Sequence, residues 1–148
     1  MYILDTDHLS ILESRKGVEF DHLYTHIERV HQSRFHLTIV TFHEQITGWN
    51  RFLSKSNNTQ GLIKGYRQLE MLLKRFADAR ILPFSVAAAE VFEELRRQKI
   101  RVGTMDLRIA SIAIANRMTL LTRNTVDFER IPNLIFEDWT VLRDEKKG

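Results

Sequence analysis

The stretch YILDTDH, residues 2–8, runs from three apolar residues directly into two aspartates. Its apolar part is short and compatible with a buried strand. Asp5 would stand at the end of this strand, with Asp7 two positions later. Aspartates at such a place serve as helix caps, metal ligands or phosphorylated nucleophiles, and the remaining sequence discriminates among these roles.

Four more apolar segments have the composition of strands, and helical patterns lie between them. Residues 106–117 are apolar on most faces and predict a buried helix, while residues 85–99 predict a helix with Ser85 as its N-cap. Strands that alternate with helices predict an α/β fold with a mainly parallel central sheet of four to five strands. The predicted strands cover residues 2–5, 36–40, 81–84, 119–122 and 134–137.

The 148 residues are 43% hydrophobic and 28% charged, which predicts one globular domain over residues 1–142 with a frayed tail at 143–148. Cysteine is absent, which excludes disulfides, thiolate zinc sites and a cysteine nucleophile. No apolar run approaches the ~20 residues of a membrane helix. The first residues also lack the pattern of a secretion signal, so we expect a cytoplasmic protein without a membrane partner. A net charge of +3 permits a polyanionic partner without requiring one.

Four acidic residues fall close to the ends of predicted strands. Asp5 ends the first strand, Glu44 follows the second, Asp127 follows the fourth, and Asp106 opens the buried helix before the fourth. Ligands of open parallel sheets bind outside the carboxyl ends of the strands, where the connections diverge. The order of the elements therefore allows the four acids to share one cleft.

Each acid has an ordinary structural explanation when it is taken alone. Asp5 or Asp7 could cap the first helix, Thr41 and Glu44 have the spacing of a capping box, and Asp106 suits the first turn of a helix. As a set, carboxylates in one cleft repel one another, and a divalent cation removes that repulsion. Mg²⁺ takes oxygen ligands and commonly binds a few carboxylates together with phosphate, which makes phosphodiester hydrolysis a candidate reaction.

The combined motifs resemble the PIN-domain ribonucleases, and most closely the VapC-type toxins of bacterial toxin–antitoxin pairs. The resemblance rests on four segments in the family's order: YILDTDH (2–8), LTIVTFHEQITGW (37–49), GTMDLRIASIAIANRMTLLTRNTVDFERI (103–131) and NLIFEDW (133–139). It implies a three-layer α/β/α fold and an endoribonuclease that depends on Mg²⁺ or Mn²⁺. It also implies an RNA substrate, a cognate antitoxin protein as partner and a homodimer.

By this resemblance, Asp5, Glu44 and Asp106 are catalytic acids that bind the metal. Asp127 is the fourth, with Asn124 as a substitute ligand, because Asn124 stands where many members of the family have aspartate. An asparagine can still coordinate Mg²⁺ through its carbonyl oxygen or orient a water molecule. This departure weakens one assignment and leaves the other three unchanged.

Further residues take supporting roles by the same resemblance. Thr122 orients an acid or a water molecule through its hydroxyl, and Thr6 and Asn124 belong to this supporting group. Asp7, where the family more often has asparagine, is a helix cap, a supporting acceptor or an extra ligand. Arg108 and Arg123 lie near the acids in the sequence and are candidates for contacting RNA or the antitoxin.

Two alternative functions stay open at this point. Because Asn124 replaces an acid, the domain could be catalytically weak and bind RNA or a protein partner through the same cleft. The DTD motif also occurs in haloacid-dehalogenase-type phosphatases, in which Asp5 would be the nucleophile. Those enzymes continue the motif as D-x-D-x-T/V, whereas this chain has Leu9 at the last position.

Two further patterns have both structural and functional interpretations. His22 and His26 have the i,i+4 spacing of a zinc pair but no third ligand in a recognisable motif, so an exposed or interfacial helix face is the better interpretation. The basic run RRQKIR (96–101) either complements the dipole at a helix C-terminus or contacts a phosphate backbone.

Overall fold

Five short strands form the central sheet of the computed structural model, which describes residues 1–142. In chain order the strands are β1 (Tyr2–Leu4), β2 (Phe35–Thr38), β3 (Ile81–Leu82), β4 (Thr119–Leu121) and β5 (Phe136–Glu137). They lie in the order β3-β2-β1-β4-β5, and every neighbouring pair is parallel. This arrangement confirms the predicted α/β fold with a parallel sheet. The tail expected at residues 143–148 lies outside the described part of the chain.

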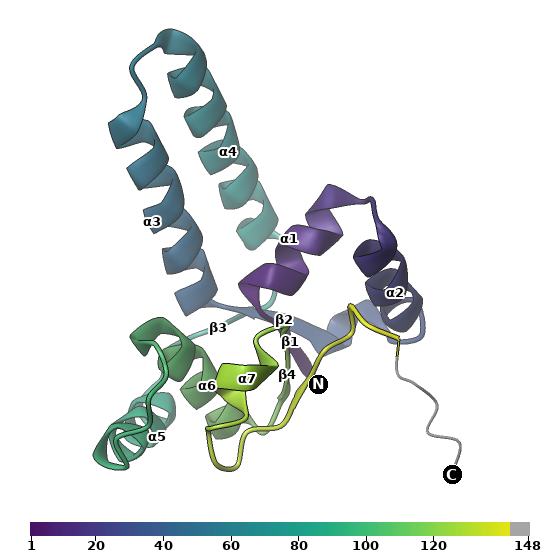
Figure 1. The fold of residues 1–148 in the computed structure, drawn as a ribbon, viewed down its shortest axis with the longest axis vertical. Helices are drawn as coiled ribbons and strands as arrows, with labels where there is room; N and C mark the ends of the chain where they lie inside the picture. The colour runs from purple at the N-terminus through teal and green to yellow at the C-terminus, as the bar shows by residue number, and fades with distance from the viewer. Residues whose placement is uncertain (143–148) are drawn as a thin grey trace.

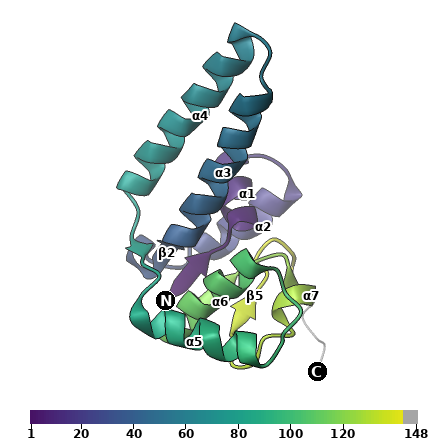
Figure 2. The same cartoon turned by 90° about the vertical axis from the view of Figure 1, so that its left-hand side faces the viewer.

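Helices cover both faces of the sheet and complete the three layers (Figure 1). The long antiparallel hairpin of α3 and α4 extends away from the sheet, with α1 and α2 on the same side, while α5, α6 and α7 lie on the other side (Figure 2). The helices are α1 (Thr6–Ser14), α2 (Val18–Ile27), α3 (Ile39–Lys55), α4 (Thr59–Ala77), α5 (Val86–Arg97), α6 (Thr104–Asn116) and α7 (Thr125–Phe128). A 3-10 turn at Gln32–Arg34 precedes β2. Within residues 1–142, no helix combines the length and apolar character that a membrane crossing requires.

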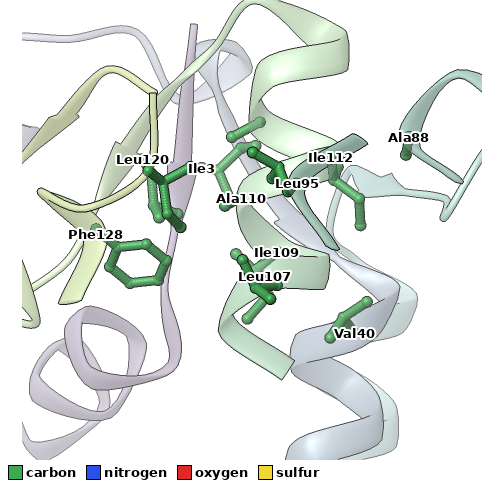
Figure 3. Close-up of a cluster of buried hydrophobic side chains, with 12 residues drawn as sticks. Ile3, Val40, Ala88, Leu95, Leu107, Ile109, Ala110, Ile112, Leu120 and Phe128 are labelled. Carbon is green, nitrogen blue, oxygen red and sulfur yellow. The ribbon is translucent and has the colours of Figure 1, made fainter. Parts of the chain in front are cut away.

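Two hydrophobic cores lie on opposite faces of the sheet because successive strand residues point in opposite directions. Ile3 and Leu120 face the core formed with α5, α6 and α7, whereas Leu4 and Leu121 face the core formed with α1, α2 and α4. Figure 3 shows the first core, in which the buried helix α6 supplies the largest share of side chains. Both central strands are therefore buried on both faces, as their continuous apolar sequences predict.

The start of α3 differs from the sequence prediction. The strand predicted for residues 36–40 ends at Thr38, and the next two residues already form the first turn of α3. Thr38 is the N-cap, because its Oγ1 accepts a hydrogen bond of 3.1 Å from the backbone N–H of Thr41. The predicted capping box of Thr41 and Glu44 is wrong: Thr41 lies inside the helix, and Oε1 of Glu44 has no hydrogen-bond partner among the described residues.

Replacing Thr38 with valine should lower the free energy of unfolding by about 1 kcal/mol, as expected for a lost N-cap. Thr38 is fully buried, so water cannot replace the acceptor that the Thr41 N–H loses. Thr41→Val is the matched control, since it removes a buried hydroxyl of the same size but leaves the cap in place. Urea denaturation measures both variants, and a larger loss for Thr41→Val would contradict the assignment of Thr38 as the cap.

Candidate active site at the carboxyl ends of the strands

Asp5 lies at the centre of the candidate site. β1 and β4 are paired in parallel register, so Asp5 and Thr122 both follow directly from the ends of neighbouring strands. Oδ2 of Asp5 accepts a hydrogen bond of 2.9 Å from the Thr122 hydroxyl, and Oδ1 accepts one of 2.8 Å from the backbone N–H of Thr6. Only 6% of Asp5 is exposed. Burial, followed by the charge of Asp7, raises the pKa of Asp5 to about 7.

Thr122 connects three parts of the site through one buried hydroxyl. Besides donating to Asp5, this hydroxyl lies 3.3 Å from Oδ2 of Asp7 and accepts a hydrogen bond of 3.1 Å from the backbone N–H of Asn124. It therefore joins the end of β1, the first turn of α1 and the loop that leads to α7. This geometry supports the predicted orienting role of Thr122.

Asp7 has hydrogen-bond donors at both carboxylate oxygens. Oδ2 accepts from the backbone N–H of Arg123 at 2.9 Å, and Oδ1 lies 2.8 Å from Nδ1 of His8. His8 is fully buried, and its Nε2 accepts a hydrogen bond from the backbone N–H of Trp139, which assigns the ring proton to Nδ1. Burial raises the pKa of Asp7, but the hydrogen bonds from His8 and Arg123 outweigh it and leave this pKa below its usual value. These contacts favour a supporting acceptor over a metal ligand.

Glu44 brings an acid from α3 into the site. Its side chain is half-buried, and Oε1 is shielded from solvent without a hydrogen-bond partner among residues 1–142. Burial, followed by the charges of Asp106 and Asp7, raises the pKa of Glu44. A buried carboxylate oxygen without a donor is costly, so this atom calls for a ligand such as a cation or a water molecule.

Asp106 and Asp127 stand in the first turns of α6 and α7. The side-chain nitrogen of Asn124 donates to both of them, at 3.3 Å to Oδ2 of Asp106 and at 3.0 Å to Oδ2 of Asp127. Burial, followed by the charges of Asp127 and Asp7, raises the pKa of Asp106. Asn124 thus bridges two acids through its nitrogen and keeps its carbonyl oxygen for another partner.

The acids lie near one another, but their side chains are not arranged around a common metal position. The pKa values of Asp5, Glu44 and Asp106 are each raised partly by another acid of the site, so these charges lie within electrostatic reach of one another. No group of three or more histidine, aspartate or glutamate side chains within residues 1–142 is arranged to hold a metal ion. The donors still fit a hard cation, because they are oxygens, carry negative charge and include the unpartnered Oε1 of Glu44. Side-chain rotations would have to bring them around the ion.

Comparison with known proteins assigns the family. The PIN domain family model matches residues 2–134. The chain belongs to the PIN-domain family. Among its relatives, ribonuclease VapC2 of Rickettsia felis is 41% identical over 76 residues, and the match covers 49% of this chain and 54% of that protein. The chain therefore spans about half the length of this relative. Ribonuclease VapC1 of the same organism is 32% identical over 108 residues, which cover 70% of this chain and 75% of that protein.

A solved structure agrees with this PIN-domain assignment along most of the chain. The crystal structure of VapBC2 from Rickettsia felis bound to a DNA fragment from its promoter matches with a TM-score of 0.68 and 29% identity, over 93% of this chain and 98% of that chain. The predicted resemblance to VapC-type PIN domains is confirmed. With the family assigned, the phosphatase interpretation of the DTD motif loses its support.

The two arginines predicted to contact RNA or the antitoxin have different surroundings in this PIN domain. Arg123 forms a two-pronged ion pair with Glu19 of α2, with N–O distances of 2.8 and 3.3 Å. Arg108 lies with its guanidinium 5.9 Å from the ring centre of Phe92 and donates to Sδ of Met105 at 3.4 Å. None of the ion pairs formed among residues 1–142 involves Arg108. Of the two arginines, only Arg123 has its charge neutralised by a carboxylate among residues 1–142, and a phosphate contact by Arg108 stays a prediction.

The basic run at residues 96–101 begins at the end of α5. Arg97 pairs with Glu94 at 2.8 Å, and Arg96 approaches Glu93 at 3.8 Å. Both arginines stand in the last turn of the helix, where a positive charge is favoured by the dipole. The structural interpretation accounts for these two cations, and a phosphate contact by this run stays a prediction.

Three histidines hold the segment that follows β5. His22 contacts the carbonyl oxygen of Thr140 through Nδ1 at 3.0 Å, and the ring of His26 stacks on Trp139 with centres 5.0 Å apart. These contacts support the interfacial interpretation of the His22 and His26 pair over a zinc site.

His8 was not predicted from the sequence. Its signal is a histidine three residues after Asp5, on the buried face of the helix that Asp5 caps.

Asp5→Asn should make the protein more stable at neutral and alkaline pH when divalent metal is removed with EDTA. The pKa of Asp5 is raised in the folded state from 3.8 to about 7, so the wild-type protein loses stability as pH rises between these values. The variant avoids this loss, which amounts to at most about 4 kcal/mol by pH 8 and vanishes near pH 4.

Urea denaturation at pH 4 and pH 8 tests this expectation. Asp78→Asn, at an exposed position where α4 ends, is the matched control and should show no comparable gain. A gain of the same size at both pH values would show that the ionisation of Asp5 is not its cause.

Proposed function

We propose that this PIN domain is a metal-dependent endoribonuclease and the toxin of a toxin–antitoxin pair. The proposal is carried by the convergence of Asp5, Glu44 and Asp106 beyond the strand ends, with Oε1 of Glu44 buried and unpartnered. The relatives named ribonuclease VapC support cleavage of RNA. The VapBC2 structure supports an antitoxin as the partner.

Mg²⁺ or Mn²⁺ is the cation that this donor set suits. Asp5, Glu44 and Asp106 would hold it, with Asp127 or the carbonyl oxygen of Asn124 as the fourth ligand. The chemistry that such a cation supplies when bound is polarisation of a phosphoryl oxygen and a lower pKa for water. The repulsion among the acids, which adds to burial in raising their pKa values, would then be relieved.

The chain's own residues have separate tasks in this proposal. The hydroxyl of Thr122 fixes the orientation of Asp5, and the side-chain nitrogen of Asn124 fixes Asp106 against α7. Asp7 keeps its hydrogen bonds from His8 and Arg123 and contributes negative charge. Arg108, which has no carboxylate partner within residues 1–142, would contact the phosphate backbone beside the acids.

A cognate antitoxin would inhibit the enzyme by laying a segment into the acidic cleft. The negative charge gathered there favours a basic side chain on that segment, because complementary charge fixes both the partner and its register. We propose a homodimer as the assembly of the toxin, in keeping with its resemblance to VapC-type proteins.

Asp5→Asn and Asp106→Asn should each reduce RNA cleavage by about 100-fold or more, since each removes a charged group at the reacting centre. Cleavage of a fluorescently labelled single-stranded RNA gives the rates, and circular dichroism checks that both variants are folded. Asp78→Asn serves as the matched control and should cleave at the wild-type rate. If both site variants cleave at the wild-type rate, the proposed mechanism is wrong.

Mn²⁺ should raise the melting temperature of the wild-type protein and have a smaller effect on Glu44→Gln. A ligand that binds only the folded state adds about 2.7 kcal/mol at a hundred times its Kd. Glu90→Gln, at an exposed position on α5, is the control and should respond as the wild type does. If Mn²⁺ and Mg²⁺ leave the wild-type melting temperature unchanged, the catalytically weak RNA- or partner-binding alternative is favoured.

A further inference from the structure

A groove lies between α1 and the α3–α4 hairpin, next to the acidic site. The two views show α1 beside this hairpin (Figures 1 and 2). The groove holds about 380 Å³, which lies in the range of ligand pockets, roughly 300–1,000 Å³. Two of its lining residues directly follow proposed metal ligands, since Thr6 follows Asp5 and Gln45 follows Glu44. Along the chain, the groove lining therefore begins one residue away from two of the proposed ligands.

The lining combines aromatic rings with hydrogen-bonding groups. Trp49 and Phe52 of α3 meet edge to face, with ring centres 5.4 Å apart. Gln45 and Gln68 bring side-chain amides from α3 and α4. Oγ1 of Thr6 and Oε1 of Gln45 are shielded from solvent and have no hydrogen-bond partner among residues 1–142. A ligand with a flat apolar face and a polar edge would match the rings and the two amides, once a rotation of the Gln45 side chain turns its buried oxygen into the groove.

Gly48 leaves open space in the lining of the groove, and the packing of the fold does not require a glycine at this position. It lies inside α3, where glycine is less stable than alanine, and it lines the groove between Gln45 and Trp49. A Cβ added at Gly48 would meet no atom within 4 Å. Gly65 of α4 is different, because a Cβ there would collide with the side chain of Leu53. Packing explains Gly65, but it leaves Gly48 without a structural reason.

We infer that this groove binds an unpaired nucleobase of the RNA, next to the phosphate held at the acidic site. Proteins recognise single-stranded RNA by stacking its bases on aromatic side chains and by hydrogen bonds to the base edges. Trp49 supplies the stacking surface, the amide of Gln45 supplies the edge contact, and Gly48 leaves the space. The inference rests on the proposed function and makes Gln45 and Trp49 determinants of the sequence that is cut.

The lining favours a nucleobase over a helix of a protein partner. An amphipathic helix needs a long apolar groove for anchors spaced over two turns. Here the ion pair between Glu13 and Arg75, with an N–O distance of 3.0 Å, lines the same groove. The side chains of Gln45, Gln68 and Ser10 add further polar groups to the lining. A small planar ligand with hydrogen-bonding edges fits this mixture better.

Oligonucleotide binding in a non-cleaving background tests the inference. In Asp106→Asn protein with Mg²⁺ present, titration with single-stranded RNA hexamers that carry each base at one varied position should quench the fluorescence of Trp49. Adding Gly48→Leu, which places a bulky side chain at the lining of the groove, should weaken binding about 5- to 100-fold, the effect of losing one base–aromatic stack. Gln45→Ala should reduce the difference among the four bases. Asn50→Leu, at an exposed position on the same helix, is the matched control and should bind as the background does.

The outcomes separate this inference from the proposed function. If the protein with native Asp106 cleaves RNA but Gly48→Leu changes neither hexamer binding nor the cut sites, the inference is wrong and the proposed function stands. If hexamers bind through the groove but RNA is never cleaved, the nucleobase site stands and the proposed function fails. If Gly48→Leu spares hexamer binding and instead prevents co-purification with a co-expressed antitoxin, the groove holds protein and the inference is overturned.

Discussion

The hydrogen bond from Thr122 to Asp5 joins the ends of the two central strands, and the acidic site depends on it. Asp5 is buried, so without this donor one of its oxygens would face the protein interior unpaired. The same hydroxyl accepts from Asn124, whose amide reaches Asp106 and α7. One buried hydroxyl thereby connects the acid that follows β1 with the acids in the first turns of α6 and α7. Glu44 lies outside this chain of hydrogen bonds, and the start of α3 sets its position.

Much of the fold could be predicted from the sequence because buried parallel strands are short apolar runs. The strand predicted at residues 119–122 differs by one residue from β4. The prediction failed at Thr38, where Ile39 and Val40 continue the β-branched pattern of the strand although they belong to α3. Local propensity is a weak preference, and a buried N-cap hydroxyl overrides it. No periodic pattern reveals which of the neighbouring threonines points at the helix end.

The acidic residues of the site could be predicted because the topology brings the carboxyl ends of parallel strands to one edge of the sheet. The groups that donate hydrogen bonds to these acids could not be predicted. Arg123 is close to Asn124 in sequence, yet its side chain turns to Glu19 on α2. Such pairs join distant elements and leave no periodic signal. The space beside Gly48 is equally hidden, because it depends on how α1 packs beside the α3–α4 hairpin. Local sequence therefore indicates the reacting groups better than the surroundings that orient them.

The two edge strands, β3 and β5, have two residues each. Pro83 follows β3 directly and has no backbone N–H to offer a neighbouring strand. Edges this short present few unpaired backbone groups, so they are poor templates for a strand added by another chain. Growth of the sheet across molecules is thereby discouraged at both sides. Another chain is therefore expected to bind at helix faces and loops. There, side-chain contacts determine which partner binds, and backbone hydrogen bonds between strands do not.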